Sequence, residues 1–290
     1  MKNHENNDDP LVSAILIAHN REKTLVNAID SILQQTYQNI EIIIVENSPT
    51  ARVHAIVESY IDKTARHFKD IRINEYVNGN IARNRGIDTT TGMLVAFLDD
   101  DDEWLPTKIS KQVQFFLRHK EVGTVFTGLK KVINNQRIVL DVRAYAPISD
   151  FRHQIFHGIP TVTSSLMFKK DVLERYRFDE NLTHWQEYDL LIQLSVVTLF
   201  AYIPEALTLI NVNQKTKNRL SNQLNPWEKS VTRIRDKYRE RLGDSLGEDY
   251  FNFQTQYLWE KITREEKNIG WFKSRYDVIR LARHTKKSDI

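Results

Sequence analysis

Four consecutive aspartates, Asp99 to Asp102, are the residues whose type and spacing most clearly indicate chemistry. They directly follow an apolar run, Met93 to Leu98, that reads as a buried strand. Carboxylates this close raise one another's pKa, so we expect a cation beside them. A hard divalent ion, Mg²⁺ or Mn²⁺, fits best, held by one or two carboxylates and by phosphate oxygens of a substrate. The alternative is a solvated acidic turn, which the position after a buried strand disfavours.

Strands and helices alternate through the half of the chain that contains the aspartates, which favours an α/β fold around a mainly parallel sheet. Polar residues follow two further strands: His19-Asn20-Arg21 after the first and Glu46-Asn47 after the second. With right-handed crossovers, the carboxyl ends of all three strands share one edge of the sheet, where such folds bind ligands. The expected elements are strands at 12–18, 40–45, 71–76 and 93–98 and helices at 22–35, around 53–61 and at 81–88.

The pattern continues less regularly beyond the aspartates. We expect a helix after Pro106, strands at 123–127, 163–168, 200–203 and 207–212, a hairpin at 131–145, and helices at 170–176 and from Trp185. Residues 213–225 are polar, and the rest of the chain is helical by composition. The predicted organisation is therefore a tail at 1–10, a catalytic α/β domain at 11–212, and a polar loop with a C-terminal helical extension at 213–290.

Composition excludes several classes of site. The chain of 290 residues has 41% hydrophobic and 27% charged residues and a formal charge of +3, as expected of a globular protein with a sizeable core. The absence of cysteine excludes disulfides, thiolate metal sites and cysteine nucleophiles. No basic-aromatic repeat indicates nucleic-acid binding, no signal peptide is visible, and the apolar stretch Leu190 to Ile203 is too short to span a membrane. We expect a cytoplasmic protein.

Five stretches resemble the inverting family 2 glycosyltransferases, whose catalytic domain is a nucleotide-binding α/β fold of the GT-A type. They occur in the family's order across roughly 11–212: Val12 to Asn20, Ile42 to Asn47, Asn78 to Gly86, Leu98 to Pro106 and Gln186 to Leu190. The C-terminal region is not covered. The resemblance implies transfer of a sugar from a nucleotide-sugar donor to a hydroxyl group, with Mn²⁺ or Mg²⁺ as cofactor.

The resemblance assigns roles around the aspartates. Asp101 would bind the metal ion and Asp99 would contact the ribose. Asp100 holds the variable middle position of the Asp-x-Asp motif and is counted with the nucleotide-binding residues, a solvated side chain being the alternative. Asp102 would be structural. From the first stretch, Ala18 and Asn20 join the nucleotide site.

Glu46 matches the position where the family usually has an aspartate that holds the nucleotide base. A carboxylate only accepts hydrogen bonds, so it suits a base with an imino N–H such as uracil or thymine. An ordinary acid in the turn after a strand is the alternative. One of Arg83 and Arg85 would face the diphosphate, where a guanidinium makes charge-assisted contacts. The sequence does not say which one.

Glu187 matches the family's catalytic base, which takes the proton of the acceptor hydroxyl, although aspartate is more usual there. A solvated acid at a helix start is the alternative. Asp189 lies two residues on and does not share its helical face, so it would orient the loop or cap the helix. Trp185 is equally consistent with a sugar-stacking platform and with a core residue. A histidine common in the family after the last strand is missing here, where Lys215, Lys217 and Arg219 are the nearest cations.

The leading hypothesis is a metal-dependent inverting glycosyltransferase that uses a UDP-sugar, less favourably a dTDP-sugar, and a saccharide acceptor, plausibly lipid-linked, in cell-surface glycan synthesis. A sugar nucleotidyltransferase or a dehydrogenase would need a glycine-rich loop, and the residues from Ala18 to Lys23 contain no glycine. A non-catalytic nucleotide-sugar- or glycan-binding module stays open, since Glu46 and Glu187 both depart from aspartate. The segment Trp271 to Arg283 suits packing, a homodimer contact or an anionic membrane surface.

Overall fold

Strand β1 (Val12–Ala18) lies inside a sheet and is buried along its whole length, as its unbroken apolar sequence predicts. It pairs in parallel with β2 (Ile40–Asn47) on one side and β4 (Leu94–Asp99) on the other. Strand β3 (Phe68–Ile73) continues the parallel sheet beyond β2. The computed structural model describes residues 9–64, 67–133, 137–143, 147–149, 151, 155, 161–212 and 224–238.

The register of these strands brings their carboxyl ends to one edge. Ala18 lies opposite Glu46, and Ile17 lies opposite Asp99. The polar residues that follow each strand therefore start from the same level of the sheet. The expected α/β fold around a largely parallel sheet is confirmed for this half of the molecule.

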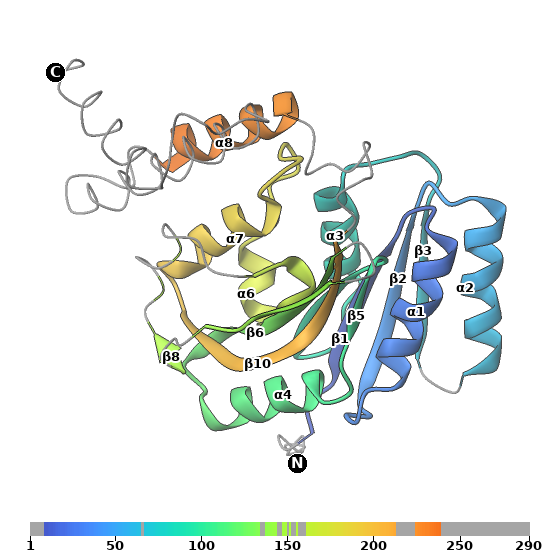
Figure 1. The fold of residues 1–290 in the computed structure, drawn as a ribbon, viewed down its shortest axis with the longest axis horizontal. Helices are drawn as coiled ribbons and strands as arrows, with labels where there is room; N and C mark the ends of the chain where they lie inside the picture. Colours follow the sequence, from blue (N-terminus) through green and yellow to red (C-terminus); the bar gives the residue numbers. More distant parts are fainter. Residues whose placement is uncertain are drawn as a thin grey trace, which may run out of the picture.

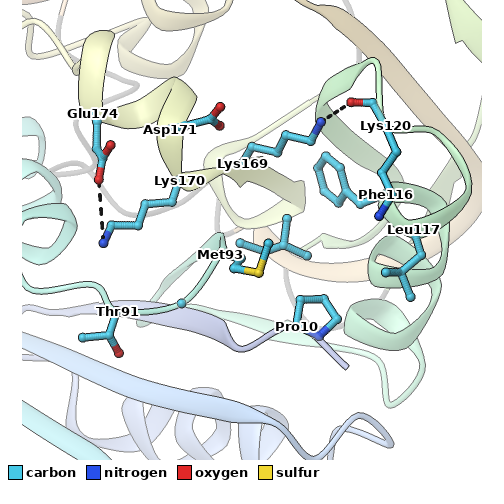
Figure 2. A pocket seen from close by; sticks show the side chains of 12 residues that line it. Pro10, Thr91, Met93, Phe116, Leu117, Lys120, Lys169, Lys170, Asp171 and Glu174 are labelled. Atoms are coloured by element: carbon cyan, nitrogen blue, oxygen red, sulfur yellow. Dashed lines mark hydrogen bonds and ion pairs between the residues drawn. The ribbon is translucent and has the colours of Figure 1, made fainter. Parts of the chain in front are cut away.

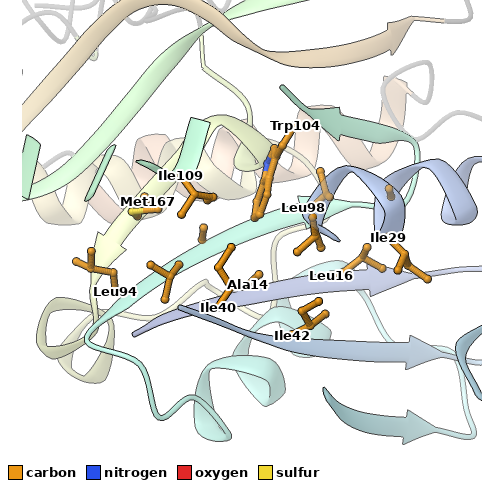
Figure 3. Close-up of a cluster of buried hydrophobic side chains, with 14 of the residues drawn as sticks. Ala14, Leu16, Ile29, Ile40, Ile42, Leu94, Leu98, Trp104, Ile109 and Met167 are labelled. Atoms are coloured by element: carbon orange, nitrogen blue, oxygen red, sulfur yellow. The ribbon is translucent and has the colours of Figure 1, made fainter. Parts of the chain in front are cut away.

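Helices cover both faces of the sheet (Figure 1). On one face, α1 (Glu22–Leu33), α2 (Ala51–Lys63) and α4 (Lys108–Arg118) enclose a core around Leu16, Ile42 and Leu98, part of which Figure 3 shows. On the other face, α3 (Gly79–Asp88), α6 (Lys170–Arg175) and α7 (Gln186–Ser195) enclose a second core around Ile15 and Phe97. Alternate residues of one strand thus belong to different cores.

The sheet continues past β4 with antiparallel pairs. Strand β9 (Leu166–Lys169) joins β4 to β6 (Val122–Ile133), and β6 forms the expected hairpin with β7 (Arg137–Asp141). Strand β10 (Leu199–Val212) runs parallel to β6 and pairs with β8 (Ile148–Ser149). The two strands expected at 200–203 and 207–212 form one element, whose register shifts after Ile203 and again after Ala206. The bulge lets the strand pass Pro204, which cannot donate to the sheet.

The aspartate run also turns back into the sheet, which the sequence did not predict. Residues Asp102–Trp104 form the short strand β5, antiparallel to β10, with Asp102 opposite Ile210. Just beyond β10, helix α8 (Leu224–Tyr238) follows and lies beside α7 (Figure 1), with the hydroxyl of Tyr238 donating to the backbone oxygen of Asp189 at 3.2 Å. In the described parts of the chain we find no helix that is long and apolar enough to cross a membrane. The segments 213–223 and 239–290, with Lys215, Lys217, Arg219 and the stretch Trp271 to Arg283, lie outside the described residues, as do residues 1–8 of the tail.

Candidate active site

Arg83 joins three distant segments at the carboxyl edge of the sheet. Its Nη2 donates to Asp99 Oδ1 at 2.7 Å, and its Nη1 donates to Gln186 Oε1 at 2.6 Å. The arginine side chain is only 7% exposed, while that of Asp99 is 33% exposed, so water reaches the ion pair from the aspartate side only in part. The contacts connect helix α3 to the end of β4, 16 residues further along the chain, and to the start of α7, 103 residues further along.

Helix α3 holds Arg83 in place through its own anchors. The side chain of Asn78 caps the helix by accepting from the backbone N–H groups of Asn80 and Ile81 at 2.9 and 3.0 Å. Asn80 and Asn84 then donate to backbone oxygens of the segment before α7, at Asp179 and Phe178. Arg85 is exposed on another side of the helix. Of the two arginines, the structure places Arg83 beside the aspartates.

Glu187 lies in the first turn of α7, next to this network. Burial raises the pKa of its carboxyl group; the charge of Arg83 lowers it, and the charge of Asp99 raises it. Trp185 immediately precedes the helix with a positive φ of 55°, an uncommon backbone conformation for a bulky residue. Its ring is half-buried and packs edge-on against Tyr188, with ring centroids 4.9 Å apart. Glu187 therefore belongs to the same electrostatic environment as Asp99 and Arg83.

The middle aspartate is buried and organises the loop after β1. Asp100 Oδ2 accepts from the backbone N–H of His19 at 2.7 Å, and Oδ1 accepts from the guanidinium of Arg21. Burial raises the pKa of Asp100 to about 6, against the lowering effects of Arg21 and the His19 N–H. With the residue only 1% exposed, the solvated alternative for Asp100 is wrong.

The two flanking aspartates keep partly exposed carboxylates at Asp-x-Asp spacing. The side chains of Asp99 and Asp101 are 33% and 25% exposed, and Asp101 lies 3.4 Å from Arg21. Asn211 of β10 donates to the backbone oxygen of Asp101 at 3.0 Å. Asp102, in contrast, is buried and accepts from Ser164 at 2.6 Å, in agreement with its expected structural role.

This donor set fits a hard divalent ion together with an anionic ligand. Two partly exposed carboxylates supply the few oxygen ligands that Mg²⁺ or Mn²⁺ takes from a protein when phosphate oxygens complete its shell. Beside them, Arg83 Nε is buried and has no hydrogen-bond partner among the described residues, so it keeps a donor for an anion. Asp99 and Asp101 are the residues that could hold the ion.

The turns after β1 and β2 are joined at the same edge. Asn20, with φ of 51°, donates from Nδ2 to the backbone oxygen of Ser48 at 3.1 Å and accepts from the N–H of Thr50 at 2.9 Å. Asn47 exchanges two hydrogen bonds with the backbone of Val77, at 2.7 and 3.0 Å. Ala18 is fully buried at the end of β1. Its side chain is a buried methyl group, so Ala18 can contribute only backbone N–H and C=O groups to the site.

Glu46 is fully buried on the α2 face of the sheet. Its Oε1 lies 2.8 Å from His54 Nδ1. Burial and the adjacent Glu46 raise the pKa of Asp70, on β3, to about 6. Direct contact between Glu46 and a base stays a prediction, and the geometry adds a second role, since the side chain ties β2 to α2 directly below the Asn47 turn.

Asp189 anchors helix α8 instead of facing the aspartates. Its fully buried carboxylate accepts from Lys237 Nζ at 2.9 Å and from the Tyr238 hydroxyl at 2.9 Å, both on α8, and from Gln193 at 2.9 Å. Asp179 pairs with Arg233 of the same helix at 3.0 Å. These contacts hold α8 against the helix that carries Glu187.

A pocket of about 550 Å³ lies at the other end of the strands, where β4 begins (Figure 2). Met93 and Phe116 form part of its apolar wall, and Lys120 and Lys169 contribute charge. Lys169 donates to the backbone oxygen of Lys120 across it. The pocket contains none of the predicted site residues.

Two residues of the site had no predicted role. Gln186 contacts Arg83, and Arg21 contacts Asp100 and Asp101. The position of Arg21, three residues after a buried strand at the same sheet edge as an acidic run, was the signal that could have identified it.

Comparisons with known proteins find similar sequences and similar folds. Residues 13–177 match the family described as glycosyl transferase family 2. The chain is 31% identical to an uncharacterized glycosyltransferase of Rickettsia typhi over 238 residues, 77% of this chain and 71% of the relative. It is 32% identical over 133 residues, 46% of this chain and 50% of the relative, to the UDP-Glc:alpha-D-GlcNAc-diphosphoundecaprenol beta-1,3-glucosyltransferase WfgD of Escherichia coli.

Two solved structures share the fold at low identity. Staphylococcus aureus TarS in complex with UDP-GlcNAc has a TM-score of 0.69 and 16% identity, and the match covers 87% of this chain and 73% of TarS. The mannosyltransferase PcManGT of Pyrobaculum calidifontis in complex with GDP-Man and Mn²⁺ has a TM-score of 0.64 and 14% identity, covering 97% and 81%.

Proposed function

Because the chain belongs to glycosyl transferase family 2 and has the family's GT-A-type fold, we propose that it is a metal-dependent inverting enzyme that moves a sugar from a UDP-sugar to a saccharide hydroxyl. A dTDP-sugar is the less favoured donor. The observation that carries the proposal is the Asp99–Arg83–Gln186 chain of contacts. It joins the acidic run to the helix start on which Glu187 lies.

Glu187 is the base of the proposed reaction. The acceptor hydroxyl attacks the anomeric carbon on the side opposite the diphosphate and loses its proton to the Glu187 carboxylate, while the bond from carbon to diphosphate oxygen breaks. Burial raises the pKa of Glu187, which brings its proton affinity closer to that required near neutral pH. The stereochemistry at the anomeric carbon inverts because a single displacement takes place.

Two positive charges would stabilise the leaving diphosphate: a metal ion held by Asp101 and the guanidinium of Arg83. Asp101 would hold Mg²⁺ or Mn²⁺, which neutralises the charge that develops on the diphosphate. The Nε of Arg83, buried and without a partner among the described residues, points to a charge-assisted contact with the same group. Asp99, held by Arg83, contacts the ribose. Trp185, just before the helix that carries Glu187, is given a supporting role, whereas Arg85 lies on another side of α3 and is given none.

The nucleoside lies against the joined turns after β1 and β2 in this proposal. Ala18, Asn20 and Glu46 border this end, and Asp100 fixes the first of the two turns through His19 and Arg21. UDP-linked donors appear in the names of the Escherichia coli relative and of the TarS complex. These names support uracil as the base.

The acceptor is a saccharide, and we favour a lipid-linked one in the synthesis of a cell-surface polysaccharide. The Escherichia coli relative is named for a diphosphoundecaprenol-linked acceptor. We place the enzyme in the cytoplasm, at the inner face of the membrane, with the C-terminal region in contact with the membrane or with a second copy of the chain.

A comparison of three variants tests the proposed reaction. UDP release and transfer are measured with a panel of UDP-sugars and Mn²⁺ or Mg²⁺. Glu187→Gln keeps UDP affinity and loses transfer by roughly 10²-fold or more, as expected when a general base is removed. Asp101→Ala loses metal-dependent UDP binding. Glu174→Gln, an exposed acid on α6, serves as the matched control and keeps wild-type turnover.

Equal turnover by wild type and Glu187→Gln would remove Glu187 from the mechanism. Donor binding without turnover, whatever acceptor is supplied, would instead favour a non-catalytic nucleotide-sugar-binding module. Turnover that persists in Asp101→Ala with all divalent ions chelated would remove the metal ion from the proposal.

A further inference from the structure

A second cluster of potential metal ligands lies away from the aspartate run. Glu46 on β2, His54 on α2 and Asp70 on β3 each offer one ligand atom, and these atoms all lie within 4.8 Å of one another. Two carboxylate oxygens and one imidazole nitrogen form a mixed donor set that suits Zn²⁺ and related transition metals. The three residues come from three elements that meet at the β3 edge of the sheet.

One carboxylate oxygen of this cluster is buried and has no hydrogen-bond donor among the described residues. Glu46 is fully buried, and its Oε2 has no hydrogen-bond partner among the described residues. A buried carboxylate oxygen without a partner is costly, and a second carboxyl group, that of Asp70, increases the cost through like charge. A bound cation would remove both penalties.

The imidazole is already oriented for metal binding. His54 Nε2 lies 3.0 Å from Oε1 of Glu58, one helical turn further along α2, while Nδ1 faces Glu46 Oε1 at 2.8 Å. A ring N–H held by a carboxylate is the usual outer contact of a metal-bound histidine. With the proton on Nε2, the lone pair of Nδ1 points toward the cluster.

In the structure, the positive charge next to this cluster is the guanidinium of Arg72. Its guanidinium contacts both ring nitrogens of His54, and its Nε lies 3.9 Å from Glu46 Oε1. Nδ1 therefore faces a group that only donates and a group that only accepts, and it can satisfy one of them. The arginine side chain is 43% exposed, so it can turn into solvent when a metal ion enters.

We propose that Glu46, His54 and Asp70 bind a divalent transition-metal ion of the Zn²⁺ class, with Glu58 as the outer carboxylate and water in the remaining position. The ion would cross-link β2, β3 and α2 directly below the Asn47 turn. This site is separate from the predicted metal site of the aspartate run. Glu46 shares a sheet face with Ile44, in the core under α2. Asp99, the first residue of the aspartate run, shares the opposite face with Phe97, in the core under α3. The proposal does not depend on the proposed function.

Calorimetric titration of the full chain with Zn²⁺, after chelation and dialysis and in excess Mg²⁺, tests this site. Wild type and Asp101→Ala each bind one equivalent. His54→Gln and Asp70→Asn bind at least about 10-fold more weakly, and Glu58→Gln weakens binding by roughly 10-fold, as for other outer-shell contacts. His119→Gln is the matched control, because its imidazole also has an acidic neighbour, Glu121, at 3.5 Å.

Asp70 is exposed, so Asp70→Asn keeps the fold and remains informative if His54→Gln does not. Binding of Zn²⁺ by both variants with wild-type affinity would overturn the proposal. No binding by the wild type at about 10 µM Zn²⁺ would also overturn it and leave Arg72 and a proton shared by the two carboxyl groups as the neutralising charges.

Discussion

At the scale of single residues, Arg83 interacts with three side chains of the site. It donates hydrogen bonds to Asp99 and Gln186, and its charge acts on the nearby Glu187. It pairs with Asp99 at 2.7 Å, and its charge lowers the pKa of Glu187 against the larger effect of burial. Removing the charge leaves burial and Asp99, which raise this pKa, opposed by the hydrogen bond from the backbone N–H of Glu187 itself. The proton affinity of the proposed base therefore depends on a residue of a different helix.

We predict that Arg83→Gln moves the acid limb of the pH dependence of kcat/KM to higher pH. A base must be deprotonated to act, and loss of a neighbouring positive charge raises its pKa. The direction of the shift is read from rates between pH 5 and 9. Arg83→Lys, which keeps the charge, is the matched variant and keeps the limb near its wild-type position. A lower rate with an unshifted limb in Arg83→Gln would show that Arg83 does not act on Glu187.

Asp100 makes a prediction about stability. Burial raises its folded pKa to about 6, above its value in the unfolded chain. The folded state then holds more protons between pH 4 and 6, so wild-type stability falls as pH rises through this window. Asp100→Asn has no carboxyl group at this position, so its stability does not fall in this way. The difference in unfolding free energy between wild type and Asp100→Asn therefore changes by up to roughly 3 kcal/mol between pH 4 and 6.

Urea unfolding at pH 4 to 7 with a chelator present measures this difference. Asp88→Asn, an exposed aspartate on α3, is the control and follows the wild-type profile. A constant difference between Asp100→Asn and wild type over the whole range would contradict the raised pKa of Asp100.

Residue type and spacing predicted the acidic run as a site and the family resemblance predicted Glu187 as the base, but neither indicated which arginine lies beside the aspartates. Arg83 and Arg85 are two positions apart on one helix, so they point in different directions. Which of them faces the aspartates depends on which side of α3 packs against the sheet. The burial of Asp100 also depended on a distant residue, Arg21. The local sequence shows which residues are charged, but their partners are set by which segments the fold brings together at the edge of the sheet.

At the scale of elements, the close approach of α3 to β1 positions Arg83. Gly86 faces the strand, and a Cβ atom there would lie 2.6 Å from Cγ2 of Ile15. We predict that Gly86→Ala lowers the unfolding free energy by roughly 1–3 kcal/mol, as for other overpacked cores. It also raises KM for the donor, because α3 must move away from the sheet together with Arg83.

Chemical unfolding and donor kinetics check this prediction, with Ile15→Ala as the partner variant. Removing Cγ2 of Ile15 makes room for the new methyl group, so the double variant is less destabilised than the sum of the two single variants. Additive losses would mean that the contact between Gly86 and Ile15 does not limit the packing of α3.

The elements themselves were predictable where the apolar pattern is local. The runs at β1, β2 and β4 and the helical spacing of α1 gave nearly correct bounds. Strand β10 was split in two by Pro204 and Glu205, because a bulge that crosses a proline leaves no sign in the apolar pattern. Strand β5 was missed since its pairing with β10 joins residues about a hundred positions apart.

At the scale of the whole molecule, helix α8, which follows the last strand in sequence, lies beside α7, the helix that carries Glu187 (Figure 1). The predicted division at residue 212 coincides with the end of β10. Asp189 and Asp179 nevertheless bind Lys237, Tyr238 and Arg233 across that division. The family match ends at residue 177, so these contacts lie outside the matched segment.

We predict that Lys237→Met lowers the unfolding free energy by about 1–2 kcal/mol and reduces kcat. It leaves the fully buried Asp189 carboxylate with neutral donors only, a cost that the partial exposure of Lys237 moderates. Lys229→Met, exposed on the same helix, is the control and has no effect. Because Asp189→Asn removes the charge that Lys237 balances, the double variant Asp189→Asn/Lys237→Met recovers part of the stability that Lys237→Met loses. Thermal unfolding and turnover are measured together, since a loss of stability with unchanged kcat would show that α8 holds the domain without positioning Glu187.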